Sequence, residues 1–64
     1  MNGKIVRKTD NRGFGFIKSG DKEFFFHLSG CLTNFDDLHE GDNITFDEEY
    51  SPKGPRAKNI RLMD

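Results

Sequence analysis

The most constraining feature of this sequence is the alternation Gly13-Phe14-Gly15-Phe16, which Ile17 follows. Neighbouring side chains of a β-strand point to opposite faces, so the two phenylalanines share one face and the glycines share the other with Ile17. A glycine inside a strand usually marks a tight bend or the close approach of another backbone, as at the corner of a small barrel. We therefore expect the glycine face to point into a barrel and both phenylalanine rings to lie outside it.

A second aromatic run, Phe-Phe-Phe-His-Leu, begins at residue 24. In a strand, one face would carry Phe24, Phe26 and Leu28, an apolar set suited to the core. The opposite face would carry Phe25 and His27. If this strand pairs with the Gly/Phe strand as a hairpin, the outward rings of both become cross-strand neighbours and form one continuous surface.

Period-two alternation recurs between turn-forming residues, and no segment keeps helical spacing beyond two turns. We expect five strands, at residues 3–9, 13–18, 22–28, 42–49 and 56–62, with tight turns joining the first three into a meander. Residues 29–41 form a long connection with a helical turn near 36–39, and residues 51–55 form a loop. The inward side chains of the last two strands are expected to be Ile44, Phe46, Ala57 and Ile60.

The length of 64 residues, 33% of them apolar, allows one small domain over residues 1–64 with a thin core. A flat sheet of this composition would leave edges and one apolar face exposed, so closure into a barrel is favoured. Five strands with a meander and a long crossing loop fit the all-β Greek-key barrel known as the oligonucleotide-binding fold. An SH3-like barrel is the competing topology.

A net charge of −1 argues at first against nucleic acid, but the charges are segregated. Residues 1–22 carry six Lys and Arg against two Asp, residues 23–49 carry eight acidic residues without Lys or Arg, and residues 50–64 carry four Lys and Arg against one Asp. If the two ends meet in the fold, one face is basic. Bases stack on exposed rings while phosphates contact adjacent cations, so the pattern predicts binding of single-stranded nucleic acid. The alternative is a protein-interaction module whose phenylalanine face meets a partner chain.

Several motifs together resemble the bacterial cold-shock proteins. These are Lys4-Ile5, Arg12 to Ile17, Phe24 to His27, Gly54-Pro55, Ala57 and Asn59-Ile60, in this order along nearly the whole chain. The resemblance implies a five-stranded barrel that binds single-stranded RNA or DNA without catalysis, as a monomeric, cytoplasmic, chaperone-like protein with pyrimidine-rich strands as the expected ligand. It assigns base stacking to Phe14, Phe16, Phe25 and His27, and a loop aromatic to Phe35. With the neighbouring cations, the expected binding residues are Arg7, Lys8, Arg12, Phe14, Phe16, Lys18, Phe25, His27, Phe35, Lys53 and Arg56.

The first strand departs from the family pattern. Val6, Arg7 and Lys8 stand where the family usually has a basic residue followed by Trp and Phe, so two stacking rings are replaced by cations. An arginine can still stack its guanidinium plane on a base, whereas a lysine acts as a point charge. Leu28 stands where an aromatic residue is usual.

Other sites are not indicated. His27, Cys31 and His39 lack a standard zinc spacing, and the adjacent Asp36 and Asp37 are expected to be solvated. The run Gly13-Phe14-Gly15 lacks the later glycine of a dinucleotide-binding motif. One cysteine excludes an internal disulfide, and the sequence shows neither a signal peptide nor a membrane-spanning apolar run. We expect an intracellular protein with no metal, cofactor or enzymatic activity.

Overall fold

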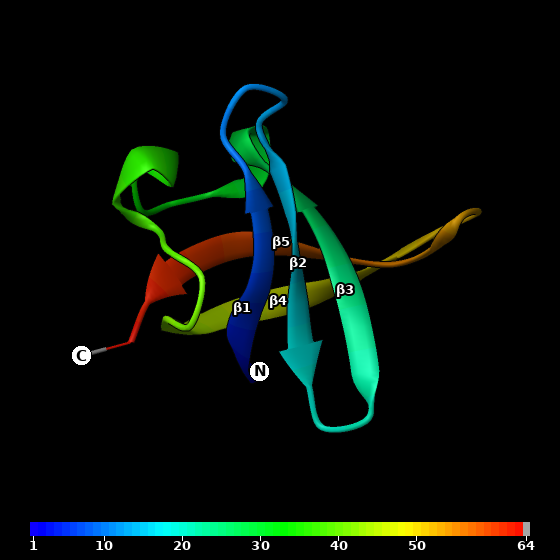
Figure 1. Cartoon of the computed structure of the whole chain (residues 1–64). Helices are drawn as coiled ribbons and strands as arrows, with labels where there is room; N and C mark the ends of the chain where they lie inside the picture. Colours follow the sequence, from blue (N-terminus) through cyan, green and yellow to red (C-terminus); the bar gives the residue numbers. More distant parts are fainter. Residues whose placement is uncertain (64) are drawn as a thin grey trace.

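The computed structural model describes residues 1–63, and Asp64, the last residue of the predicted domain, lies outside them. Five strands close into a barrel in the spatial order β1-β2-β3-β5-β4 (Figure 1). Their bounds are β1 Asn2–Thr9, β2 Phe14–Ser19, β3 Lys22–His27, β4 Asn43–Ser51 and β5 Gly54–Leu62. The prediction of a closed all-β barrel that begins with a three-stranded meander is confirmed.

Two pairings between strands distant in sequence close the barrel. β1 pairs antiparallel with β4, where Gly3 lies opposite Ile44. β3 pairs in parallel with β5, where Phe25 lies opposite Arg56. The second pairing brings the β4–β5 hairpin beside the aromatic strands, which positions its basic residues next to the rings of β3.

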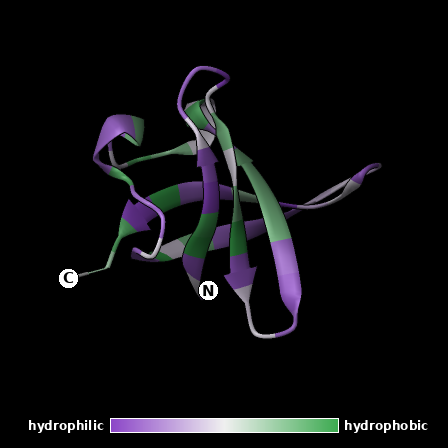
Figure 2. Cartoon of the chain, viewed as in Figure 1, coloured by the Kyte–Doolittle hydropathy of each residue, from purple (hydrophilic) through white to green (hydrophobic). Residues whose placement is uncertain are grey.

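The core follows the predicted alternation. Its buried side chains are Ile5, Ile17, Phe24, Phe26, Phe35, Leu38, Ile44, Phe46, Ala57 and Ile60. Figure 2 shows the apolar stretches of β2 and β3 side by side, with the hydrophilic residues of both strands next to the turn that joins them. Gly15 has the predicted inward position, because a Cβ atom there would lie 2.6 Å from the ring of Phe26 and 2.5 Å from the carbonyl oxygen of Arg7. The close approach of a ring and a backbone therefore explains this glycine.

Two residues expected at the ends of strands lie outside them, although Gly13 is buried as predicted. Leu28, predicted to join the core, is 48% exposed, because β3 ends at His27 and the chain turns into the 3-10 helix η1, Leu28–Gly30. Gly13 precedes β2 in the turn, with a φ of +70° that favours glycine, and its carbonyl oxygen accepts the Leu28 N–H at 2.8 Å. That hydrogen bond marks the point where strand pairing gives way to the turn.

The connection between β3 and β4 crosses one end of the barrel. The Leu32 N–H bonds to the carbonyl of Ile60, and the Gly41 N–H bonds to the carbonyl of Ile5. Its second short helix, η2 Phe35–Asp37, begins one residue before the predicted helical turn and ends two residues before the predicted end. The following loop differs more: β4 and β5 continue to a two-residue turn at 52–53, in place of the five-residue loop predicted at 51–55. No helix of the described residues is long and apolar enough to cross a membrane.

Candidate nucleic-acid interface

A β-bulge in β1 decides which of its side chains face outward. Ile5 lies opposite Ile17 in the core, but the next paired residue, Arg7, lies opposite Phe16, so Val6 is the extra residue. A bulge of this kind shifts the alternation of the strand by one position. Arg7 therefore lies on the outer surface beside the Phe16 ring, and the following residue, Lys8, takes an inward position opposite Gly15.

Cross-strand pairing arranges the outer surface in rows. The central row consists of successive partners on four strands: Arg7, Phe16, Phe25 and Arg56. The neighbouring row consists of Thr9, Phe14 and His27. We call the four ring-bearing residues, Phe14, Phe16, Phe25 and His27, the aromatic platform. The pairing confirms that these four residues lie next to one another on one face.

The three phenylalanine rings of the aromatic platform form a compact cluster that remains open to solvent. The ring centroid of Phe25 lies 5.7 Å from that of Phe14 and 5.8 Å from that of Phe16, and the Phe14 and Phe16 centroids are 6.3 Å apart. All four platform residues are half-buried, whereas Phe24 and Phe26, their neighbours on β3, are fully buried. Each outward phenylalanine ring thus packs against the other two while keeping part of its surface free.

His27 is held in place by the start of η1. The Ser29 N–H donates to His27 Nδ1 at 3.2 Å, and the Ser29 hydroxyl lies 2.9 Å from the same nitrogen. Because a backbone N–H can only donate, Nδ1 is the acceptor, and a neutral His27 carries its proton on Nε2. Sequence reasoning did not identify Ser29 as part of the site, although a hydroxyl residue two positions after a histidine is a signal for such a local cap.

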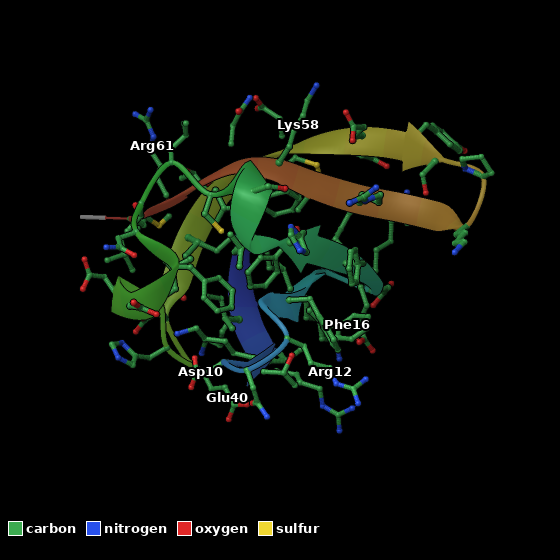
Figure 3. All side chains as sticks on the ribbon, turned by 90° about the horizontal axis from the view of Figure 1, so that it is seen from above. Asp10, Arg12, Phe16, Glu40, Lys58 and Arg61 are labelled. Carbon is green, nitrogen blue, oxygen red and sulfur yellow. The ribbon has the colours of Figure 1, made fainter. Side chains whose placement is uncertain are left out.

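Cations surround the platform without acidic partners. Among residues 1–63, the ion pairs shorter than 4.0 Å involve only the basic residues Lys8, His39 and Lys58. Among the cations predicted to contact phosphate, those with no carboxylate oxygen within 4.0 Å in residues 1–63 are Arg7, Arg12, Lys18, Lys53 and Arg56. Figure 3 shows Arg12 on the same side of the barrel as Phe16, and Arg61 on the far side. Lys4, which sequence reasoning also missed, lies directly opposite Lys18 and extends this basic margin.

Lys8 and Phe35 lie apart from the platform. Phe35 is 9% exposed and packs 6.1 Å from the core ring of Phe26. The Lys8 ammonium lies 4.5 Å from the centroid of the Phe35 ring and 3.0 Å from Oδ1 of Asp10, and its side chain is only 8% exposed. The Lys8 N–H also donates to Oε2 of Glu40 at 3.2 Å. Lys8 thus links β1 to the long connection, and it covers the Phe35 ring, which, contrary to the prediction, is not exposed for base stacking.

The other chemistry-bearing side chains form no additional site. Burial raises the pKa of the Cys31 thiol above its ordinary value, while the nearby Lys8 ammonium opposes this shift, so the thiol is protonated at neutral pH. Within the described part of the chain, no three His, Cys, Asp or Glu side chains are clustered so that they could hold a metal ion.

Comparison with known proteins agrees with this geometry. The model of the "'Cold-shock' DNA-binding domain" family matches residues 1–63. The chain belongs to this family. It is 41% identical over 61 residues to cold shock protein 1 of Lactiplantibacillus plantarum, covering 92% of each chain. It is 44% identical over 63 residues to the cold shock-like protein CspJ of Salmonella typhi, covering 94% of this chain and 90% of the relative.

A solved structure supports the fold independently. The structure titled "drosophila Unr CSD456" superposes with a TM-score of 0.79 at 22% identity, over 98% of this chain and 26% of that longer chain. At this identity the likeness concerns the fold alone. The five-stranded closed barrel is therefore the cold-shock domain fold, here with Arg7 and Lys8 at the first-strand positions described above.

Proposed function

We propose that this cold-shock domain binds single-stranded RNA or DNA without catalysis, with bases stacked on the aromatic platform and phosphates contacting the surrounding cations. The observation that carries the proposal is the arrangement of four half-buried rings on adjacent strands, bordered by cations that form no ion pair within residues 1–63. Contiguous exposed rings favour association with a ligand, and every base has a flat face that such rings accept.

The free energy available from this surface suits reversible binding. Stacking contributes roughly 1–3 kcal/mol per base, so four rings give a gross gain of about 4–12 kcal/mol before the cost of ordering the strand. Bases held on the platform are not free to pair, which would open hairpins and then release the strand, a chaperone-like action. Pyrimidine-rich strands are the proposed ligand, because their bases stack weakly on one another and their separation costs least.

The proposed protein acts as a monomer in the cytoplasm. The platform and its bordering cations are complete within one chain, so binding requires no second copy. A cytoplasmic location accords with the unpaired Cys31, because reducing compartments keep thiols free.

The test is a titration of fluorescein-labelled hexathymidine and hexauridine, followed by anisotropy at several salt concentrations. If the five unpaired cations each contact a phosphate, the logarithm of affinity falls with the logarithm of salt with a slope of about −3.5. Phe16→Ala should weaken binding by roughly 1–3 kcal/mol, and Leu32→Ala, on an exposed apolar residue of the long connection, is the matched control. Failure to bind either strand at low salt, or affinity that does not respond to salt, would favour the alternative of a protein-interaction module.

A further inference from the structure

The β4–β5 hairpin lies beside one edge of the aromatic platform and borders an open hollow there. The hollow has a volume of about 570 Å³ and is lined by Phe25 together with Pro52, Lys53, Pro55 and Arg56 of the hairpin. This volume lies within the roughly 300–1,000 Å³ of small-molecule sites and is sufficient for one nucleotide. The ring of Phe25 is shared between the platform and the hollow, so a base stacked on it reaches into the hollow.

The guanidinium of Arg56 lies close to that ring. The parallel pairing of β3 with β5 sets Arg56 directly opposite Phe25, and its Cζ lies 5.3 Å from the ring centroid. Flat stacking over the centre of the ring would bring the two groups to about 3.5–4.0 Å. The guanidinium therefore lies over the ring without stacking flat on its centre, within reach of a base that shares the Phe25 ring.

The guanidinium is not engaged by a carboxylate. Glu49 is the cross-strand partner of Arg56, yet its Oε2 pairs with Lys58 Nζ at 3.5 Å. Within residues 1–63, no acidic side chain forms an ion pair with Arg56. A half-buried arginine next to a half-buried ring thus has donors available to a ligand.

The chemistry of this group selects among the bases. A guanidinium offers parallel N–H donors and no acceptor, so it pairs best with two adjacent acceptors. Guanine presents O6 and N7 side by side, whereas adenine combines its N7 acceptor with an amino donor, and thymine separates its two carbonyl groups by an N–H. Cytosine has two adjacent acceptors on its pairing edge, but its single ring extends less far from Phe25 toward Arg56 than the double ring of guanine.

We propose that the hollow is a guanine-binding subsite in which guanine stacks on Phe25 and accepts two hydrogen bonds from Arg56 through O6 and N7. The inference rests on the proposed function and adds a base preference at one position of an otherwise pyrimidine-rich strand. The rings of Pro52 and Pro55 line the hollow and offer apolar surface to the base. Lys53, on the hairpin turn, is placed to contact the phosphate of the same nucleotide.

The experiment compares hexathymidine with strands that carry one guanine at each of the six positions in turn. One position should bind the wild-type protein about 10-fold more tightly when it holds guanine. At that position, inosine, which retains O6 and N7, should match guanine. The base 7-deazaguanine, which lacks N7, should lose most of the gain, and adenine and cytosine should show little gain.

Substitutions of Arg56 test whether its side chain causes the guanine preference. Arg56→Lys retains the charge without the donor fork and should remove the guanine preference, which is measured as the ratio of guanine-strand to hexathymidine affinity within the same variant. Arg56→Gln should also remove the preference, and Arg61→Gln, an exposed β5 arginine on the far side of the barrel, should retain it. Melting temperatures show whether each variant folds, and the base analogues test the proposal on the wild-type protein even if a variant does not.

The outcomes separate this inference from the proposed function. Equal binding of guanine and thymine at every position overturns the guanine subsite and leaves the proposed function intact, provided that hexathymidine still binds. Cytosine equal to guanine, or a guanine preference that survives in both Arg56 variants, also overturns the assignment. If no strand binds at low salt, the proposed function fails, and the subsite with it.

Discussion

Replacing Phe26 by alanine tests the division of β3 into an inner and an outer face. Phe26 has no exposed surface, and its ring packs against Phe35 and over Gly15. Truncation of a buried phenylalanine costs about 3–5 kcal/mol, and a chain of 64 residues has roughly 3–10 kcal/mol of total stability at the usual 0.05–0.15 kcal/mol per residue. The substitution therefore removes from about a third to all of the stability of the domain.

Phe25→Ala is the matched control, because it removes the same group from the next residue of the same strand. Its ring is half-buried and lies on the platform, so we expect a smaller loss of stability and a loss of strand binding of roughly 1–3 kcal/mol. Thermal unfolding followed by circular dichroism, with anisotropy titration of hexathymidine at a temperature where both variants are folded, separates the two effects. A fully stable Phe26→Ala protein, or a Phe25→Ala protein that mainly unfolds, would refute the assigned faces.

Three further predictions concern β1 and the long connection. Arg7→Trp should tighten hexathymidine binding by restoring a ring beside Phe16, and it should reduce the salt slope by about 0.7 because one phosphate contact is lost. Binding can be followed by quenching of the new indole, because the chain has no other Trp. Weaker binding at every salt concentration would mean that Arg7 makes a specific contact. Lys8→Ala should lower the free energy of unfolding by about 0.5–2 kcal/mol, because it uncovers the Phe35 ring. The salt slope of strand binding should not change. A slope reduced by about 0.7 would show that Lys8 contacts a phosphate after all. Cys31, whose raised pKa reflects burial, should react with a thiol reagent at pH 8 more slowly in the folded protein than in urea, and equal rates would contradict that burial.

The alternation of side chains along β2 and β3 was sufficient to predict the aromatic platform, because the inward position of Gly15 sets which face of each strand points outward. Gly15 has no room for a side chain, so it must face the Phe26 ring, and Phe14 and Phe16 must then face outward. The hairpin between β2 and β3 transfers the same division to Phe25. These relations are local in sequence, which is why they can be derived without the fold.

The errors arise where the outcome depends on contacts between distant segments. Lys8 takes an inward position only because the bulge at Val6 shifts the register of β1 against β2, and no local pattern indicates that bulge. Leu28 leaves the core because its backbone N–H bonds to the Gly13 carbonyl and the His27 ring caps the Ser29 N–H, two interactions that end β3. The position of Arg56 beside Phe25 requires the parallel pairing of β3 with β5, across about thirty residues of chain.

The residues at the first-strand positions should shift the balance of binding from stacking toward charge. The bulge places Arg7 outside, where the family resemblance would supply a ring, and Lys8 lies inward over Phe35, which is thereby covered. Stacking responds little to salt, whereas each phosphate contact contributes about 0.7 to the salt slope of a single strand. With five such contacts, affinity should fall about 100-fold between 50 and 200 mM salt.

Single variants test that balance. Phe16→Ala should lower the affinity at every salt concentration without altering the slope, because the lost ring carries no charge. Arg12→Gln, on an exposed cation beside the platform, should reduce the slope by about 0.7 and lose its effect at high salt. A wild-type affinity that falls less than 10-fold over this range would show that the rings, and not the cations, dominate binding in this member of the family.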